Sequence, residues 1–103
     1  MTTGQGFIRD LDELRSKRAK IEELAQRHGI TNIRAFGSVA RGDAGPGSDL
    51  DLLVDLHSGS SLFELVAFER ELSEVLGLKV QVFTEGAIHR MFRDRVMAEA
   101  VAV

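Results

Sequence analysis

Cysteine, tryptophan and tyrosine are all absent from the 103-residue sequence. Without cysteine there can be no disulfide bond, thiolate zinc site or cysteine nucleophile. The N-terminal region also lacks a long apolar run, so the sequence predicts neither a signal peptide nor a membrane span. These absences favour a cytoplasmic protein that makes no use of a membrane.

The composition is that of a folded protein: 44% of the residues are hydrophobic and 28% are charged. So many apolar residues argue against disorder. A chain of this length is expected to form one domain over residues 1–103.

The formal net charge of −3 is unevenly distributed along the chain. Between Asp43 and Glu74 there are eight acidic residues and one basic residue, Arg70, a formal charge of −7. Such a segment repels a phosphate backbone, so no extended nucleic acid is expected as a partner. The segment suits a cation or a basic partner protein.

Hydrophobic periodicity predicts an α/β or α+β domain in the order α-β-β-α-β-α, with helices layered on a small sheet. The first helix should run from Ile8 to a stop at Gly29, with a break or bend near residues 16–18. The other predicted elements are strands over 33–36, 49–56 and 79–83, and helices over 62–76 and from 87 to the end.

The helix over 62–76 carries two local signals. Ser61 and Glu64 match the capping-box spacing, which predicts side-chain hydrogen bonds at the helix start. The helical period predicts a buried face. Its residues are Leu65, Phe68, Leu72, Val75 and Leu76.

The candidate site lies at the two strands on either side of a glycine-rich loop. Gly37 and Ser38 follow the first strand, where backbone N–H groups and a hydroxyl can donate to phosphate oxygens. Asp49 and Asp51 lie two residues apart on the next strand, so both carboxylates fall on one face. Their apolar alternates, Leu50 and Leu52, should anchor that strand in the core.

Two neighbouring carboxylates repel each other unless a cation neutralises them. Oxygen-only ligands favour Mg²⁺ or Mn²⁺, and Mg²⁺ commonly joins one or two carboxylates to substrate phosphates. An Asp-x-Asp pair alone is more often a structural feature than a site. Together with the upstream glycine-serine turn, it points to metal-dependent phosphate chemistry.

At this point the sequence resembles a known family. The segments 36–42 and 48–54, with Gly-Ser, ten residues and then Asp-x-Asp, are similar to the signature of minimal nucleotidyltransferases of the DNA polymerase β superfamily. The tail over 92–100 also resembles the last helix of these proteins. The resemblance implies a mixed sheet with three core strands in the order 1-2-3.

The resemblance also implies roles for individual residues. Gly37 and Ser38 would bind the triphosphate of ATP, and Asp49 and Asp51 would be catalytic and hold Mg²⁺. Arg41 would either contact phosphate or brace the loop. Many such proteins pair with a HEPN-domain toxin, which they restrain by binding it or by attaching AMP.

The sequence departs from the family pattern on the third strand, where a third carboxylate is usual. Gln81 occupies that position, and its amide cannot accept a proton from an attacking hydroxyl. Asp55 and Glu85 are too far along their strands to replace it and are expected at the surface. Asp43, in the loop, is a third acid considered for the role.

Three functions follow from these observations. The first is transfer of AMP from ATP to a protein, and the second is an antitoxin that acts by binding alone because Gln81 impairs catalysis. The third, modification of a small molecule, would need a second domain for its acceptor. The acceptor, the nucleotide base and the choice of homo- or hetero-oligomer stay open.

With no Trp or Tyr, no aromatic base pocket can be picked out, and His28, His57 and His89 lack metal-ligand spacing.

Overall fold

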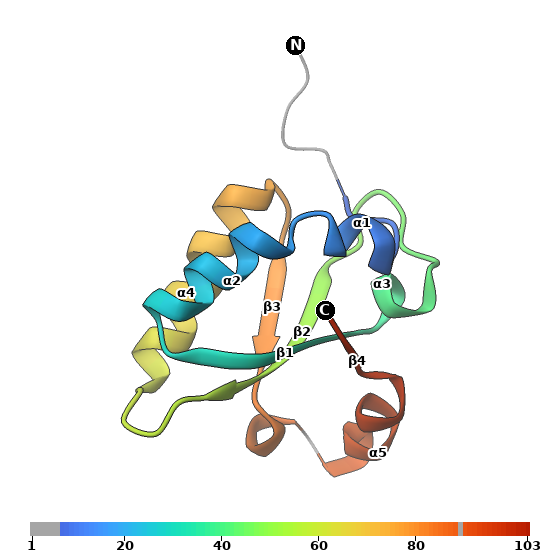
Figure 1. Ribbon diagram of the computed structural model, residues 1–103. Helices are drawn as coiled ribbons and strands as arrows, with labels where there is room; N and C mark the ends of the chain where they lie inside the picture. Colours follow the sequence, from blue (N-terminus) through green and yellow to red (C-terminus); the bar gives the residue numbers. More distant parts are fainter. Residues whose placement is uncertain (1–6, 89) are drawn as a thin grey trace.

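A four-stranded mixed sheet organises the computed structural model, which describes residues 7–88 and 90–103 (Figure 1). The strands are β1 (Ile30–Phe36), β2 (Leu50–Leu56), β3 (Val80–Phe83) and β4 (Val101–Ala102), in the order β3-β2-β1-β4. β2 is antiparallel to β1 and parallel to β3. The predicted order of the three core strands is therefore confirmed, and β4 adds an edge.

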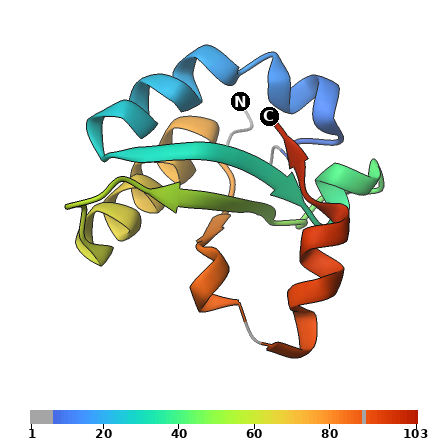
Figure 2. The ribbon, with the colours of Figure 1, turned by 60° about the horizontal axis from the view of Figure 1, so that its bottom comes forward.

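Helices lie on both faces of this sheet. They are α1 (Leu11–Arg15), α2 (Arg18–Arg27), α3 (Ser38–Arg41), α4 (Leu62–Leu76) and α5 (Arg90–Glu99), with a 3₁₀ turn η1 (Glu85–Ala87). Figure 2 shows α2 above the sheet and α5 below it. Among the described residues, no helix is both long enough and apolar enough to cross a bilayer.

The first helical segment is split in two, as the sequence predicted. Asp10 caps α1, because its side chain accepts a hydrogen bond of 3.0 Å from the backbone N–H of Glu13. The chain then turns at Ser16 and Lys17 before α2 begins. The break keeps Leu14 on the core side, where it is fully buried.

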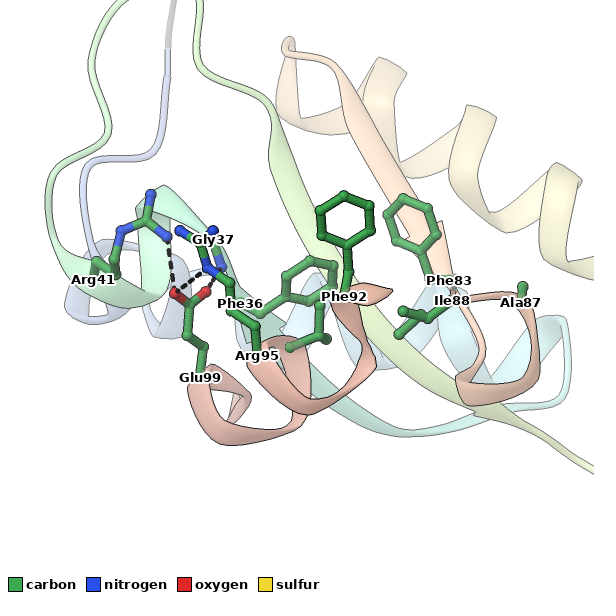
Figure 3. Close-up of a pocket in the computed structure, with 10 residues that line it drawn as sticks. Phe36, Gly37, Arg41, Phe83, Ala87, Ile88, Phe92, Arg95 and Glu99 are labelled. Atoms are coloured by element: carbon green, nitrogen blue, oxygen red, sulfur yellow. Dashed lines mark hydrogen bonds and ion pairs between the residues drawn. The ribbon is translucent and has the colours of Figure 1, made fainter. Parts of the chain in front are cut away.

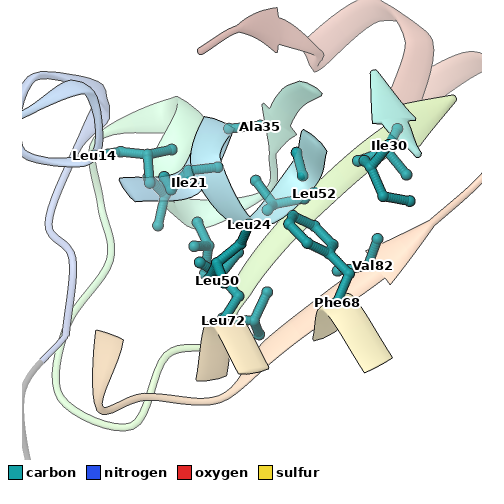
Figure 4. Close-up of a cluster of buried hydrophobic side chains, with 14 of the residues drawn as sticks. Leu14, Ile21, Leu24, Ile30, Ala35, Leu50, Leu52, Phe68, Leu72 and Val82 are labelled. Carbon is teal, nitrogen blue, oxygen red and sulfur yellow. The ribbon is translucent and has the colours of Figure 1, made fainter. Parts of the chain in front are cut away.

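The core lies between the sheet and the α2–α4 layer (Figure 4). Leu50, Leu52 and Val54 of β2 are fully buried and share one face of the strand, as alternation requires. Phe68 and Leu72 of α4 are buried in the same cluster. Each such side chain contributes about 1.5–3 kcal/mol on burial, so this layer fixes the position of β2.

Two predictions for α4 are wrong. Val75 is 48% exposed, because it lies outside the strip that faces the sheet. Ser61 is the N-cap, but its side chain makes no capping hydrogen bond. The carboxylate of Glu64 instead lies 2.7 Å from Nδ1 of His28, at the end of α2.

His28 joins α2 to α4, since its Nε2 also lies 3.1 Å from the carboxylate of Glu71. The hydrogen bond with Glu64 is the largest cause that raises the pKa of His28, and the second carboxylate adds to it. A charged imidazole is thus favoured here by two carboxylate partners. His89 lies outside the described residues.

The C-terminal prediction also needs correction, because the last helix ends at Glu99 and does not continue to the end of the chain. Val101 and Ala102 pair with Ala35 and Arg34 as the edge strand β4. The carbonyl of Ala102 accepts a hydrogen bond of 2.6 Å from Nη2 of Arg15. A sequence that alternates two β-branched valines with alanine suits this strand better than a helix.

Candidate active site

Gly37 and Asp51 lie in close contact at the end of β1. A Cβ atom added to Gly37 would lie 2.6 Å from Oδ2 of Asp51, closer than side chains tolerate. The backbone of Gly37, with φ 77° and ψ −153°, is also one that only glycine adopts readily. The glycine-serine turn and the Asp-x-Asp strand are therefore built against each other, as the sequence pattern suggested.

A row of three residues crosses the sheet beside this contact. Phe36 pairs with Asp51 across β1 and β2, and Asp51 pairs with Gln81 across β2 and β3. Paired residues of neighbouring strands point to the same face of a sheet. Gln81 therefore sits beside Asp51, at the position where the family pattern places a third carboxylate.

Burial is the main reason that the pKa of Asp51 is raised, to about 6. The charge of Asp49 raises it further, which places the two carboxylates within electrostatic reach of each other. The nearby Arg41 lowers the pKa, but its effect is smaller. A divalent cation would relieve this repulsion.

The metal-ligating atoms that Asp49, Asp51 and Gln81 can offer are oxygen atoms, from two carboxylates and one amide carbonyl. This set fits Mg²⁺ or Mn²⁺, which take hard oxygen ligands and keep positions for phosphate. Within residues 7–88 and 90–103, no three His, Cys, Asp or Glu side chains are grouped to hold a metal ion. A cation held between Asp49 and Asp51 would therefore need further ligands from a bound substrate or from water.

Glu99 is a site residue that the sequence analysis did not single out. Its carboxylate accepts a hydrogen bond of 3.1 Å from the backbone N–H of Gly37 and lies 3.1 Å from Nη1 of Arg41 (Figure 3). Burial raises its pKa, but these donors outweigh that effect and the net shift is downward. No local spacing links residues 62 apart, so only the resemblance of the tail could have drawn attention to Glu99.

Arg41 braces the loop in this structure, which is one of the two roles considered for it. Its guanidinium bonds to Asp43 at 3.3 Å and to Glu99 at 3.1 Å. Asp43 is consequently turned toward Arg41 and is 62% exposed. Arg41 also lies near enough to Asp51 to lower its pKa, so it belongs to the same electrostatic site.

The acids further along the strands are engaged elsewhere. Arg34, whose side chain is only 13% exposed, bonds to Asp55 at 3.0 Å and to Glu85 at 3.2 Å. Both carboxylates are partly exposed. The prediction that Asp55 and Glu85 are surface residues is confirmed.

Comparison with known proteins places the chain in a family. The nucleotidyltransferase domain family matches residues 17–103. A Methanocaldococcus jannaschii protein named as a candidate protein adenylyltransferase is 43% identical over 84 residues, which cover 82% of this chain and 90% of that protein. The protein adenylyltransferase MntA of Thermococcus cleftensis is 35% identical, over 80% of this chain and 83% of its own.

Solved structures agree with this assignment. The structure of a candidate minimal nucleotidyltransferase superposes with a TM-score of 0.79 at 38% identity, covering 95% of this chain and all of that one. A toxin–antitoxin complex crystallised with AMP-PNP shares the fold, with a TM-score of 0.68 at 19% identity over 82% and 69% of the two chains. The chain therefore belongs to the nucleotidyltransferase family. Within it, the chain resembles the candidate minimal nucleotidyltransferase of the first structure.

Proposed function

We propose that this chain transfers AMP from ATP to a hydroxyl group of a partner protein, and that the partner is a HEPN-domain toxin. The observation that supports the proposal is the contact of Gly37 with Asp51, because a backbone N–H that could bind phosphate then lies beside a carboxylate that could bind a cation. Relatives at 43% and 35% identity bear the name of protein adenylyltransferases. A structural neighbour was crystallised as a toxin–antitoxin complex.

In the proposed reaction, an acceptor hydroxyl oxygen forms a bond to the α-phosphorus of ATP and the bond to pyrophosphate breaks. The hydroxyl proton passes to solvent water during this step. The backbone N–H of Gly37, the Ser38 hydroxyl and Arg41 would hold the triphosphate by hydrogen bonds and charge. This chain's contribution is thus mainly positioning and charge neutralisation, which suit phosphoryl-group transfer.

Asp49 and Asp51 would hold the divalent cation. When bound, Mg²⁺ supplies charge neutralisation for the phosphate oxygens. The same two carboxylates, relieved of mutual repulsion, would then remain ionised at neutral pH. Gln81, being neutral, leaves the site with one fewer proton acceptor than the family pattern provides.

A second function is favoured by Gln81 and by the surface of α4. Without a third carboxylate, the chain could restrain a toxin by binding alone. Leu62, Phe63 and Val66 at the start of α4 are 60–86% exposed, and Glu64, Glu69, Glu71 and Glu74 lie on the same helix. An apolar patch next to acidic groups suits a basic protein partner.

Labelled ATP separates these functions. The full chain is incubated with Mg²⁺, ATP labelled at the α-phosphate and a HEPN-domain toxin from the same genome. Transfer of label to the toxin, abolished in the Asp49→Ala, Asp51→Ala double variant, is the result expected for the enzyme.

Cell protection provides the complementary measurement. If the double variant still forms the complex but no longer protects cells from the toxin, transfer is required. If it protects as well as the native chain and no label is transferred, the binding function replaces the enzymatic one.

A further inference from the structure

A cavity of about 510 Å³ opens between α5 and the sheet face that carries Phe36 and its register partner Asp51 (Figure 3). Gly37, Arg41 and Glu99 border one part of it, and Phe36, Phe83 and Phe92 border another. Its volume is within the range of small-molecule sites, roughly 300–1,000 Å³. The cavity is continuous with Gly37 and Arg41, the groups that are proposed to donate hydrogen bonds to the phosphates.

The two parts of the cavity differ in chemistry. Figure 3 shows the charged groups of Arg41, Arg95 and Glu99 gathered on one side, and the rings of Phe36, Phe83 and Phe92 with Ile88 on the other. The rings of Phe36 and Phe83 lie 5.8 Å apart at an interplanar angle of 52°. A ligand for this cavity would be anionic at one end and flat and apolar at the other.

We propose that this cavity binds the nucleobase of the nucleoside triphosphate, with a preference for a purine. The inference rests on the proposed function, because the phosphates at Gly37 and Arg41 fix where the base can lie. A nucleotide has the same division of character as the cavity, and bases bind to aromatic side chains by stacking. A purine offers two fused rings to this surface and a pyrimidine only one.

Phenylalanine side chains would thus form the aromatic base pocket, which could not be picked out from the sequence because it lacks Trp and Tyr. The three rings come from β1, β3 and α5, so only folding brings them together. Their positions in the sequence, 47 and 9 residues apart, follow no recognisable spacing. The base would be held by stacking and shape, while the charged groups orient the phosphates.

Calorimetric titration of the full chain in the presence of Mg²⁺ tests the proposal. ATP, UTP and inorganic tripolyphosphate are compared, because tripolyphosphate has the charge of the ligand without its base. We expect the native chain to bind ATP more tightly than UTP, and UTP more tightly than tripolyphosphate.

Phe92→Ala is the informative variant, since Phe92 is 55% exposed and its truncation should leave the fold intact. We expect ATP affinity to fall about tenfold, the loss of one stacked ring, with tripolyphosphate affinity unchanged. Phe63→Ala is the matched control, because Phe63 is 86% exposed on α4 and does not line the cavity. Phe92→Leu keeps apolar volume but loses the ring, so its ATP affinity should lie between those of Phe92→Ala and Phe63→Ala.

Three outcomes overturn the base site in different ways. Equal affinity of the native chain for ATP and tripolyphosphate removes the base contact but leaves the proposed function standing. Unchanged ATP affinity in Phe92→Ala, together with poorer labelling of a protein acceptor, assigns the cavity to the acceptor. If the native chain binds neither ATP nor tripolyphosphate, the proposed function fails and the base site with it.

Discussion

Gln81 is the register partner of Asp51, one strand away on the same face of the sheet. Neighbouring strands lie about 4.8 Å apart, so a carboxylate at position 81 would be adjacent to that of Asp51. Position 81 is therefore suitably placed for a third acid, but the residue there is a neutral glutamine.

Gln81→Asp should raise the rate of AMP transfer, by about 10²-fold if the new carboxylate accepts the hydroxyl proton. Single-turnover transfer of labelled AMP, at saturating ATP and Mg²⁺, measures this rate. Gln81→Asn is the matched control, because it has the shape of aspartate without the charge. Equal rates in the two variants would show that position 81 takes no part in proton transfer.

Gly37→Ala should destabilise the fold and abolish triphosphate binding. The new Cβ would meet Oδ2 of Asp51 at 2.6 Å, in a backbone conformation that alanine avoids. We expect a loss of about 3 kcal/mol in the free energy of unfolding.

Gly42→Ala reports backbone strain in the left-handed region without a steric contact, since Gly42 has φ 81° and ψ 18° and no atom within 4 Å of its Cβ position. Backbone strain alone should cost about 1 kcal/mol there. Urea unfolding of both variants gives the difference. If the two losses are equal, the contact with Asp51 is not tight in solution.

The strand with the Asp-x-Asp pair illustrates what the sequence can predict. Alternation of Leu50, Leu52 and Val54 predicts that these side chains share a buried face, because the strand period is two, and all three are fully buried. Leu53, on the opposite face, is fully buried as well, which alternation alone does not predict. Asp55 is predicted to be a surface residue on a different ground, its distance along the strand from Asp51, and it is exposed. Local patterns of this kind also located the break before α2 and the bounds of α4.

Contacts between distant segments escaped prediction. Glu99 reaches Gly37 only because β4 returns the chain to the edge of β1, and that edge pairing is two residues long. Glu64 has the sequence position of a capping residue, but bonds to His28 on a neighbouring helix. Both contacts depend on tertiary packing, which brings together groups that no local spacing links.

Asp51→Asn should stabilise the metal-free protein at neutral pH while removing its function. The folded-state pKa of Asp51 is raised from 3.8 to about 6, so the folded protein binds this proton more tightly than the unfolded chain. Stability is therefore lost as the pH rises through this interval, and the loss is complete above it. Asparagine removes the penalty, about 1 kcal/mol after allowance for the partial exposure of the group.

Thermal unfolding at pH values of about 5 and 8, without and with Mg²⁺ and ATP, checks this prediction. Without ligands, the variant should unfold at a higher temperature than the native chain at the higher pH. The difference between the two unfolding temperatures should be smaller at the lower pH. Added Mg²⁺ and ATP should stabilise the native chain alone. A variant that is less stable at both pH values would contradict the electrostatic account of Asp51.

Glu99→Gln should tighten the binding of triphosphate. The Glu99 carboxylate occupies the N–H of Gly37 and one nitrogen of Arg41, the donors that the proposed function assigns to phosphate. Two anions cannot share these donors favourably, so ATP must displace Glu99 when it binds. A glutamine keeps the shape and a weaker hydrogen bond, and the loss of one charged competitor should raise tripolyphosphate affinity by about fivefold to tenfold.

Asp94→Asn, on the exposed part of the same helix, controls for the change in net charge. Should Glu99→Gln weaken binding while Asp94→Asn does not, Glu99 would instead be a brace that holds Arg41 and the Gly37 turn in their binding geometry.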